Sequence, residues 1–465
     1  MRKLTLWRLL AVVFALGLVA AACGGDDNSD SAGDSTDGGG DAADADDGDS
    51  GDGDGDSGDG VTLRVLVHQN PPMVEFMETF NEEFEAANPD ISIDMSVVNA
   101  DDLGVSNQTR LTANDIDVTT ITVSGFANPV QPYMEGVEPP AWQTLIEAGL
   151  LMDLTDEPFI KNYDEASLEQ GGSFDGRVYS VNLGRVSYSG MFVNEDLLAE
   201  VGVDIPTTWD ELVAACEAVQ ASGNECMTAG GADGWPIFVG SYGLLGSFYP
   251  DQEALVEGLW TGDIALNDDK TLELWRRYQV YATEMLEEGV TGLAHYAAIV
   301  RYAAGDVAFA PTGVWQAPAL EDAEPGFEWT YIPFPGSDDP ADNQTLFGKY
   351  DQGWAIAADT PHPDEASAYL TAFSEPDNYN EFANAVGFLP TQPTASLDSK
   401  LGEALAPLLD SYRVGYEQWW TEPSGAGQWA NLGNGASWFA PFNEWDSAEE
   451  LANQAQADLE AGLGS

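Results

Sequence analysis

The sequence predicts an α/β protein built around a doubly wound sheet, and three observations lead to this prediction. Strand-like and helix-like segments alternate from residue 61 onward. Hydrophobic residues make up 44% of the 465 residues and aromatic residues 11%, which is enough apolar material for a sizeable core. Two helix-capping sequences occur later in the chain. At roughly 150 residues per domain, the length predicts two large domains or about three smaller ones.

The first alternating elements lie between residues 62 and 123. Residues 62–67 (TLRVLV) and 91–97 have the pattern of strands, and apolar residues recur at helical spacing over 73–84 between them. A second helix over 102–113 leads to a third strand over 118–123. Ligands of doubly wound sheets bind at the carboxyl ends of the strands. We therefore expect candidate binding residues at His68, Gln69, Asn70, Ser124 and Gly125.

Two capping boxes predict helices further along the chain. Residues 208–211 (TWDE) open a helix that carries Leu212, Val213, Cys216 and Val219 on one face. Residues 447–450 (SAEE) open the final helix in the same way. No internal repeat at a fixed period is found.

The N-terminus has the layout of an export signal. Three basic residues within the first eight precede an apolar run over 9–22, which is shorter than the roughly 20 residues that span a bilayer. Small residues at 20–22 stand directly before Cys23 and resemble the lipobox of bacterial lipoproteins. Residues 1–23 are thus expected to be a lipoprotein signal peptide, with Cys23 anchored to the outer face of the cytoplasmic membrane. The alternative is an ordinary secretory signal with an incidental cysteine.

Residues 24–60 contain almost only Gly, Asp, Ser and Ala, and they predict an extended, charged tether. Residues 53–58 (GDGDSG) match the dinucleotide-binding pattern, but no strand precedes them and their carboxylates would repel a pyrophosphate. The alternating aspartates resemble a calcium loop without its glycine and terminal glutamate. Neither pattern predicts a specific ligand site, and loose association of calcium with the tether is the alternative.

Acidic residues outnumber basic residues by 80 to 15, so the formal net charge is −65. Three bases precede Cys23 and 14 aspartates lie in 24–60, which leaves 66 acids and 12 bases, a net charge of −54, in the folded part. This charge excludes a nucleic-acid partner and disfavours an anionic membrane surface. Because self-repulsion destabilises a compact state unless salt screens it, we predict a salt-adapted source organism.

Two cysteines remain once Cys23 is assigned to a lipid. In an oxidising compartment we predict a disulfide between Cys216 and Cys226, and the alternative is a pair of buried thiols. None of the three histidines of the chain is close to these cysteines in sequence, which disfavours a metal site. We expect neither a metal nor a cofactor.

The short motifs of several enzyme classes do not occur in the sequence: G-x-S-x-G, H-E-x-x-H and G-x-x-x-x-G-K-[ST]. Glycoside hydrolases use a pair of carboxylates, but in so acidic a chain some pair will always lie at a suitable separation. Such a pair therefore neither supports nor excludes this class of enzyme. Of the 14 tryptophans, several lie beside or within three residues of Gly, Pro or Asn, and we single out Trp235, Trp315, Trp354 and Trp438. Aromatic faces suit the C–H faces of sugar rings, and core packing is the alternative role for each.

Ten segments between residues 61 and 465 carry a resemblance to a known family. They are 111–118 (LTANDIDV), 149–154 (GLLMDL), 176–182 (GRVYSVN), 191–198 (MFVNEDLL), 203–212 (VDIPTTWDEL), 305–309 (GDVAF), 313–315 (GVW), 333–336 (PFPG), 353–356 (GWAI) and 387–390 (GFLP). In this order they resemble the extracellular solute-binding proteins of ABC importers that take up sugars, of the maltose-binding type. Ile116 and Asn182 stand where this family usually has proline.

The resemblance implies a two-lobe periplasmic-binding-protein fold of type II, with doubly wound sheets joined by three hinge crossings that let the lobes close over a ligand. By similarity the crossings are near Asn182, Gln352 and Gly387. The first lobe would comprise residues 61–182 and 353–385, and the second residues 183–352 and 386–465. The resemblance also implies these ligand-binding residues: Gln69, Asn70, Ser124, Tyr188, Trp235, Tyr242, Trp315, Trp354 and Trp438.

The resulting prediction is a monomeric, lipid-anchored protein without enzymatic activity that delivers a neutral sugar to an ABC permease. The few basic residues disfavour a phosphate or polyanion, which Arg or Lys would recognise. A cationic osmolyte such as betaine, held in an aromatic cage, is the alternative ligand. A secreted glycan-active enzyme and a non-transport adhesin are the alternatives from other classes.

Overall fold

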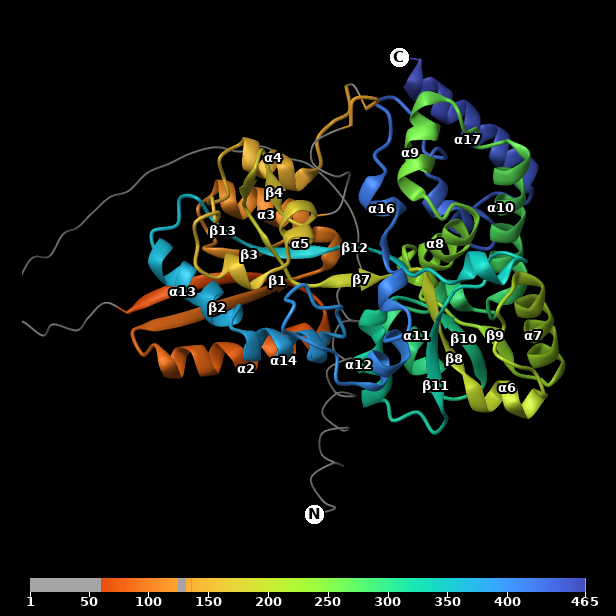
Figure 1. The fold of residues 1–465 in the computed structure, drawn as a ribbon, viewed down its shortest axis with the longest axis horizontal. Coiled ribbons are helices and arrows are strands. Elements are labelled where there is room, and N and C mark those ends of the chain that lie inside the picture. The colour runs from red at the N-terminus through yellow and green to blue at the C-terminus, as the bar shows by residue number, and fades with distance from the viewer. Residues whose placement is uncertain (1–59, 124–130, 135, 465) are drawn as a thin grey trace, which may run out of the picture. The chain divides into compact units, whose positions relative to one another are not determined.

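The computed structural model describes residues 60–123, 131–134 and 136–464, and Figure 1 shows their helices and strands. The helices around the first main sheet are α2 (Pro71–Ala87), α3 (Leu103–Thr112), α4 (Ala141–Glu147), α5 (Glu165–Gln170), α13 (Pro363–Phe373) and α14 (Pro376–Val386). The remaining helices are α6 (Glu195–Val201), α7 (Trp209–Ala221), α8 (Pro236–Phe248), α9 (Gln252–Thr261), α10 (Asp269–Val280), α11 (His295–Tyr302), α12 (Ala317–Asp322), α15 (Lys400–Leu405), α16 (Tyr416–Trp419) and α17 (Ala448–Leu463).

The first main sheet has the strand order β2-β1-β3-β13-β6. Its strands are β1 (Val61–His68), β2 (Ile91–Val98), β3 (Val118–Thr122), β6 (Val181–Asn182) and β13 (Gln352–Ile356). β1 pairs in parallel with β2 and β3, whereas β13 runs antiparallel to β3 and β6. The alternation of strands and helices predicted between residues 62 and 123 is confirmed. Later segments of the chain then complete the same sheet.

Helices cover both faces of this first sheet. α13 and α14 contact α2 on one face, and α3 and α4 contact each other on the other face (Figure 1). The two faces explain the continuous apolar run of residues 65–67 in β1: Val65 packs into one hydrophobic cluster and Leu66 into another. On α2, apolar side chains repeat every three or four residues and are buried, namely Met73, Met77, Phe80 and Phe84.

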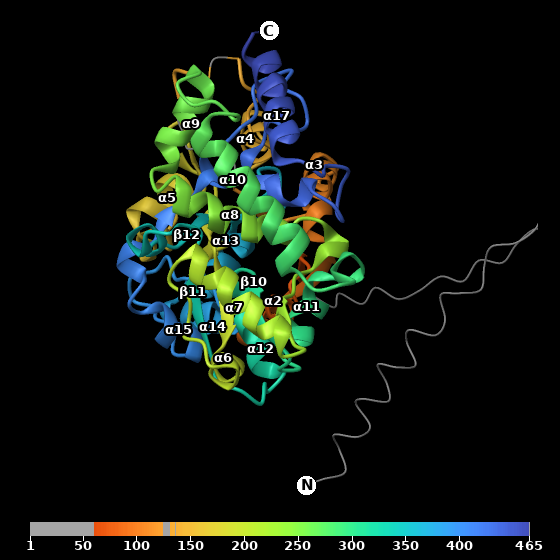
Figure 2. The same ribbon diagram turned by 90° about the vertical axis from the view of Figure 1, so that its right-hand side faces the viewer.

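The second main sheet has the strand order β11-β8-β10-β9. Its strands are β8 (Gly190–Asn194), β9 (Glu225–Met227), β10 (Val307–Pro311) and β11 (Trp329–Pro333). β9 and β10 are parallel, and β8 runs antiparallel to β10 and β11. α7 packs on β9 and α11 packs on β10. Figure 2 shows α17 lying along α10, so the end of the chain packs on this part of the fold.

Both predicted capping boxes begin helices. The Thr208 hydroxyl accepts a hydrogen bond from the backbone N–H of Glu211 at the start of α7, and Ser447 does the same for Glu450 at the start of α17, each at 3.3 Å. The Glu211 carboxylate, however, accepts from the backbone N–H of Thr207 at 2.8 Å, one residue before the expected partner. Cys216 in α7 and Cys226 in β9 form a disulfide with their Cα atoms 4.9 Å apart.

Three chain segments lie side by side between the two main sheets. β7 (Arg185–Ser187), β12 (Phe347–Tyr350) and β14 (Arg413–Val414) form a small sheet, and β4 (Ser173–Phe174) pairs with β5 (Arg177–Val178). The Asn182 amide donates to the Gln352 carbonyl at 3.0 Å, and the backbone groups of Arg185 and Leu389 bond each other at 2.8 and 2.9 Å. The segments that the resemblance implies as hinge crossings are therefore hydrogen-bonded to one another.

Among the described residues, each helix is too short or too polar to cross a lipid bilayer. The predicted signal peptide and Cys23 lie outside the described residues, and so does the tether apart from Gly60.

Candidate functional site

Each main sheet has a cavity at the carboxyl ends of a parallel pair of strands. One cavity adjoins the ends of β1 and β2, and the other adjoins the ends of β9 and β10. Open α/β sheets bind their ligands at such strand ends, because the loops and helix starts there present unpaired polar groups. We refer to the two cavities, as defined below by their lining residues, as the first and the second half-site.

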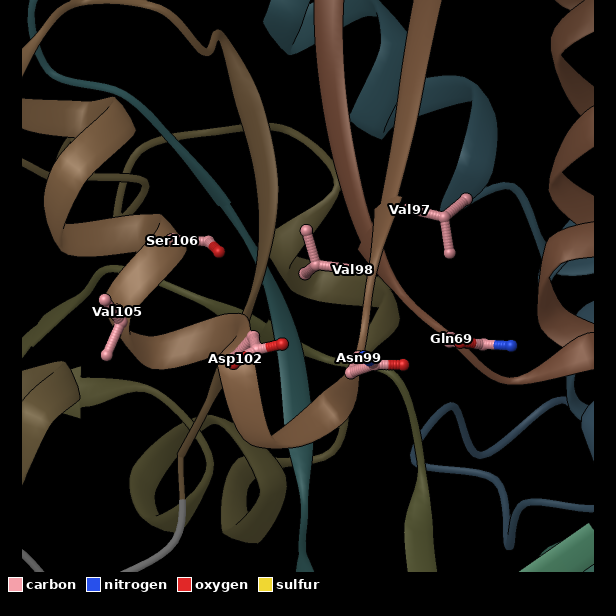
Figure 3. Close-up of a pocket in the computed structure, with 7 residues that line it drawn as sticks. All are labelled: Gln69, Val97, Val98, Asn99, Asp102, Val105 and Ser106. Carbon is pink, nitrogen blue, oxygen red and sulfur yellow. The ribbon is translucent and has the colours of Figure 1, made fainter. Parts of the chain in front are cut away.

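The first half-site is a cavity of about 410 Å³ next to the start of α3. It is lined by Gln69, Val97, Val98, Asn99, Asp102, Val105 and Ser106, which Figure 3 shows as sticks. Asn99 and Asp102 lie where β2 leads into α3. Val97 is 42% exposed and Val105 is 73% exposed, which is unusual for large apolar side chains. This half-site therefore combines amide, carboxylate and hydroxyl groups with an apolar surface that a ligand could cover.

The two amides predicted after β1 have different environments. Gln69 lines the first half-site and is exposed, and its backbone N–H donates to the Val98 carbonyl at 2.7 Å. Asn70 is only 4% exposed, and its side-chain oxygen accepts from the backbone N–H of Met73 at 3.3 Å. Asn70 is thus the N-cap of α2, and the expectation that its amide binds a ligand is corrected.

The second half-site is a narrow cavity of about 10 Å³, which is room for about one water molecule. It is lined by Thr228, Ala229, Gly230, Pro236, His295, Ala298, Ile299, Ala310, Pro311, Thr312 and Gln316. Three buried oxygens, on Thr228, Thr312 and Gln316, have no hydrogen-bond partner among the described residues. Buried polar atoms are normally paired, so these oxygens mark a place where polar groups of a ligand or water are needed.

Aromatic rings cluster around His295, which lines the second half-site. The ring centroid of Trp235 lies 4.4 Å from that of His295 and 6.2 Å from that of Trp315. Tyr296, at the start of α11, lies 4.8 Å from His295. Both Trp235 and Trp315 are partly exposed, so ring surface remains open to a bound molecule. The two tryptophans predicted for this region are thus brought together, 80 residues apart in sequence.

The two histidines near the half-sites are uncharged at neutral pH. Burial lowers the pKa of His295 to about 4, although the nearby Asp233 carboxylate acts in the opposite direction. Burial likewise lowers the pKa of His68, the last residue of β1, to about 4 against the charge of Asp351. Neither imidazole therefore offers a positive charge to a ligand above pH 5.

Tyr188 and Tyr242 pair with each other away from the residues that line either half-site. Their ring centroids are 4.6 Å apart, and the side chains are 2% and 7% exposed. Burial, followed by the charge of Glu417, raises the pKa of both phenols well above the ordinary value, so both stay neutral. In this structure the pair is part of the core.

Two of the predicted tryptophans are core residues, which corrects the expectation that they contact ligand. Trp354 in β13 is fully buried, and its ring packs edge-on against Phe373 at 5.7 Å. Trp438 is 7% exposed and stacks on Trp275 at 5.8 Å. Hydrophobic packing accounts for both rings. The predicted Ser124 and Gly125 lie outside the described residues.

Sequence reasoning missed several residues of the half-sites. Asn99 directly follows β2 and Asp102 lies three residues later, so the rule that selected Gln69 after β1 would have selected Asn99 and pointed to this loop. Thr228 follows β9 and Thr312 follows β10 in the same way. The sequence offered no comparable signal for His295, because it lies at the start of a helix and reaches the half-site only through tertiary packing.

Comparisons with known proteins identify the family of the chain. The profile of the family described as "Bacterial extracellular solute-binding protein" matches residues 79–407. A curated relative, the "Multiple sugar-binding protein" of Streptococcus mutans, is 24% identical over 310 residues, which is 65% of this chain and 69% of the relative.

Solved structures show the same fold. One described as "SBP RafE in complex with raffinose" has a TM-score of 0.71 at 20% identity and covers 87% of this chain and all of its own. A stachyose complex of a sugar transporter protein from Bacillus licheniformis has a TM-score of 0.65 at 18% identity, covering 86% and 99%. The fold is thus the two-lobe fold of sugar-binding transport proteins. Since the family profile also spans well over half of the sequence, the chain belongs to the bacterial extracellular solute-binding proteins.

Proposed function

We propose that this protein is the substrate-binding component of an ABC importer and that it captures a neutral sugar or oligosaccharide by closing its two lobes. The lobes in this proposal are residues 61–182 with 353–385, and residues 183–352 with 386–465. The hydrogen-bonded segments around Asn182, Gln352 and Leu389 serve as the hinge. The first half-site belongs to one lobe and the second half-site to the other.

The observation that carries this proposal is the complementary chemistry of the two half-sites. The first supplies amide, carboxylate and hydroxyl groups that can bond sugar hydroxyls. Beside the second, in contact with its lining residue His295, stand Trp235 and Trp315, whose faces suit the C–H surface of a sugar ring. A ligand held by both would be hydrogen-bonded on one side and stacked on the other, which is the usual anatomy of a small-ligand pocket.

The charge of the half-sites supports a neutral ligand. Neither Lys nor Arg is among the described residues that line them, and the histidines nearby are uncharged. An anionic ligand would lack the forked or point-charge donors that recognise it. The family relatives named for sugars, raffinose and stachyose support sugar over betaine as the class of ligand.

The remaining parts of the proposal concern location and partners. Membership of an extracellular family supports export through the N-terminal signal. In this proposal Cys23 carries the lipid, residues 24–60 form the tether, and the monomeric binding domain passes its ligand to the transmembrane subunits of the permease without chemical change.

Thermal unfolding with added ligands tests the proposed function. The chain from Gly60 onward, in high salt, is heated with raffinose, stachyose, maltose, trehalose, glucose or betaine. A ligand at about 100 times its dissociation constant adds roughly 2.7 kcal/mol of stability. We expect the midpoint to rise with at least one sugar, and no product to form. A rise with betaine alone, or sugar hydrolysis, would contradict the proposal.

Replacement of Trp315 shows whether the second half-site carries the binding. Trp315→Ala should clearly reduce the shift, since the stacking of a nucleic-acid base on an aromatic side chain is worth about 1–3 kcal/mol and we expect a sugar ring to lose a similar amount. Trp260→Ala is the matched control, because Trp260 is also partly exposed but lies in α9, where its Nε1–H donates to the Thr421 carbonyl at 3.1 Å. Equal shifts in the two variants would place the ligand elsewhere.

A further inference from the structure

The indole of Trp315 is held at two points. Its Nε1–H donates to Nε2 of His295 at 3.1 Å, and the side-chain nitrogen of Gln316 lies 2.6 Å from the same Nε2. Its six-membered ring lies on the backbone of Gly313, where an added Cβ atom would stand only 1.9 Å from the ring atom Cζ3. No side chain larger than that of glycine fits beneath the ring in this position. Together, the two contacts define both the place and the tilt of the indole.

His295 is itself fixed by its surroundings. It is only 7% exposed, and the carboxylate of Asp233 accepts its backbone N–H at 2.6 Å. The ring of Trp235 packs on it at 4.4 Å, and Gly230 approaches so closely that an added Cβ would lie 2.5 Å from the His295 Cα. An imidazole held in this way can act as a rigid support for its neighbour.

We propose that His295 is a positioning residue: by accepting the Nε1–H of Trp315, and with Gly313 beneath the ring, it sets the orientation in which Trp315 presents its face to the ligand. This role rests on the proposed function, in which Trp315 stacks on a sugar, but the contact exists without any ligand. His295 acts through Trp315 and does not itself have to contact the bound molecule.

The role requires an unprotonated Nε2. A protonated imidazolium has a donor at both nitrogens, so Trp315 would lose its acceptor. Asp233, on the 3-10 helix Gly231–Asp233, is the charge that acts on His295, and it opposes the effect of burial. Two other elements pack against α11, the helix of His295. β10 has no ionisable residue, and α12 carries Glu321 and Asp322 at its far end. The helix α11 itself adds Tyr296 and Arg301.

Burial lowers the pKa of His295 to about 4. We therefore expect ligand affinity to be constant from pH 6 to 8 and to fall as the pH drops through about 4.

Two variants of His295 separate positioning from simple packing. His295→Phe keeps an aromatic ring but removes the acceptor, whereas His295→Gln keeps an acceptor that does not titrate. In the ligand-free chain from Gly60 onward, the ¹H–¹⁵N indole resonance of Trp315 is identified by its loss in Trp315→Phe. We expect this resonance to shift in His295→Phe and, on acidification through about pH 4, in the wild type. We expect His295→Gln to keep it nearly in place at every pH.

Affinity for a sugar found in the thermal screen supplies the second readout. His295→Phe should weaken binding by about tenfold, the equivalent of one lost hydrogen bond, whereas His295→Gln should stay within about threefold of the wild type and lose the acid dependence. Gly313→Ala should shift the same resonance and weaken binding, which provides a test even where a histidine variant fails to fold.

Three results would overturn the positioning role: an unmoved indole resonance in His295→Phe, wild-type affinity in that variant, or an undiminished loss of affinity at low pH in His295→Gln. If the indole resonance responds as expected but no sugar binds, the positioning of the ring stands and the proposed function falls. If a sugar binds but the resonance does not respond, the proposed function stands and the role of His295 falls.

Discussion

Asp117 is a fully buried carboxylate that joins three parts of the first sheet. Its oxygens accept from the guanidinium of Arg64 at 2.8 and 2.9 Å, from the backbone N–H of Arg64 at 2.8 Å and from the Thr360 hydroxyl at 2.8 Å. Burial by itself would raise the pKa of Asp117, but the hydrogen bonds from Arg64 outweigh it and the pKa is lowered. The charged form is therefore the one that the fold stabilises.

We expect Asp117→Ala to lower the free energy of unfolding by about 3–5 kcal/mol, because it removes the buried partner of the partly buried Arg64 and leaves only the exposed Asp115, 3.6 Å away, as its counter-charge. Urea unfolding at pH 7 measures this loss. Asp153→Ala is the matched control, since Asp153 and its partner Arg177 are 36% and 63% exposed, and it should cost less than about 1 kcal/mol. Equal costs for the two variants would show that the burial of Asp117 does not matter.

The four tryptophans singled out in the sequence show that residue type and sequence neighbours do not determine whether a side chain is buried. Each lies within three residues of Gly, Pro or Asn, yet Trp235 and Trp315 are partly exposed while Trp354 and Trp438 are buried. The difference depends on which elements pack against each ring. Phe373 covers Trp354, and Trp275 covers Trp438. Neither pair is related by a helical or strand spacing, so the sequence pattern does not reveal these contacts.

Helix α2 begins at an asparagine whose role depends on the geometry of the turn before it. The stretch His68-Gln-Asn70 ends a strand, so both amides were equally good candidates for ligand binding. In the structure the extended backbone of Asn70 turns its side chain back to the first turn of α2, whereas Gln69 stays at the first half-site. Two proline residues follow Asn70 and have no backbone N–H group to donate. The backbone N–H of Met73 is therefore the first one that the Asn70 side chain can accept.

We expect Asn70→Ala to lower the free energy of unfolding by about 1 kcal/mol and to leave ligand affinity unchanged, because it removes a helix cap and no ligand contact. Asn70→Asp, which keeps a capping oxygen, should retain most of the stability. Gln69→Ala should do the opposite, weakening binding at unchanged stability. Chemical unfolding and ligand titration of the three variants measure both quantities. A loss of affinity in Asn70→Ala at unchanged stability would restore Asn70 to the binding site.

The acid excess concerns the molecule as a whole. With 66 acids and 12 bases after residue 60, most carboxylates have no basic partner available. Lys349 illustrates the imbalance, since this one ammonium group bonds both Asp351 at 2.8 Å and Glu417 at 2.7 Å. Self-repulsion among the remaining charges opposes the compact state, and added salt screens it.

We expect the melting midpoint of the chain from Gly60 onward to rise by several degrees or more between 0.1 and 2 M NaCl. The steepest part of the rise should fall below about 0.5 M, where the screening length changes most. Differential scanning calorimetry over this range gives the answer. An equal concentration of a neutral osmolyte that does not bind controls for general exclusion effects. A midpoint that stays constant or falls would remove the basis for a salt-adapted protein.

Local sequence patterns were sufficient for the α/β class, the order of elements from β1 to β3 and the two helix caps, because these depend on periodicity and capping within a few residues. The ordered motifs were sufficient for the family. The division of the eight predicted binding residues that the structure describes into half-site, cap and core depended on tertiary packing, which joins segments far apart in the chain. His295 reaches Trp315 and Trp235 only because α11 packs on β10, so no pattern around residue 295 could reveal it.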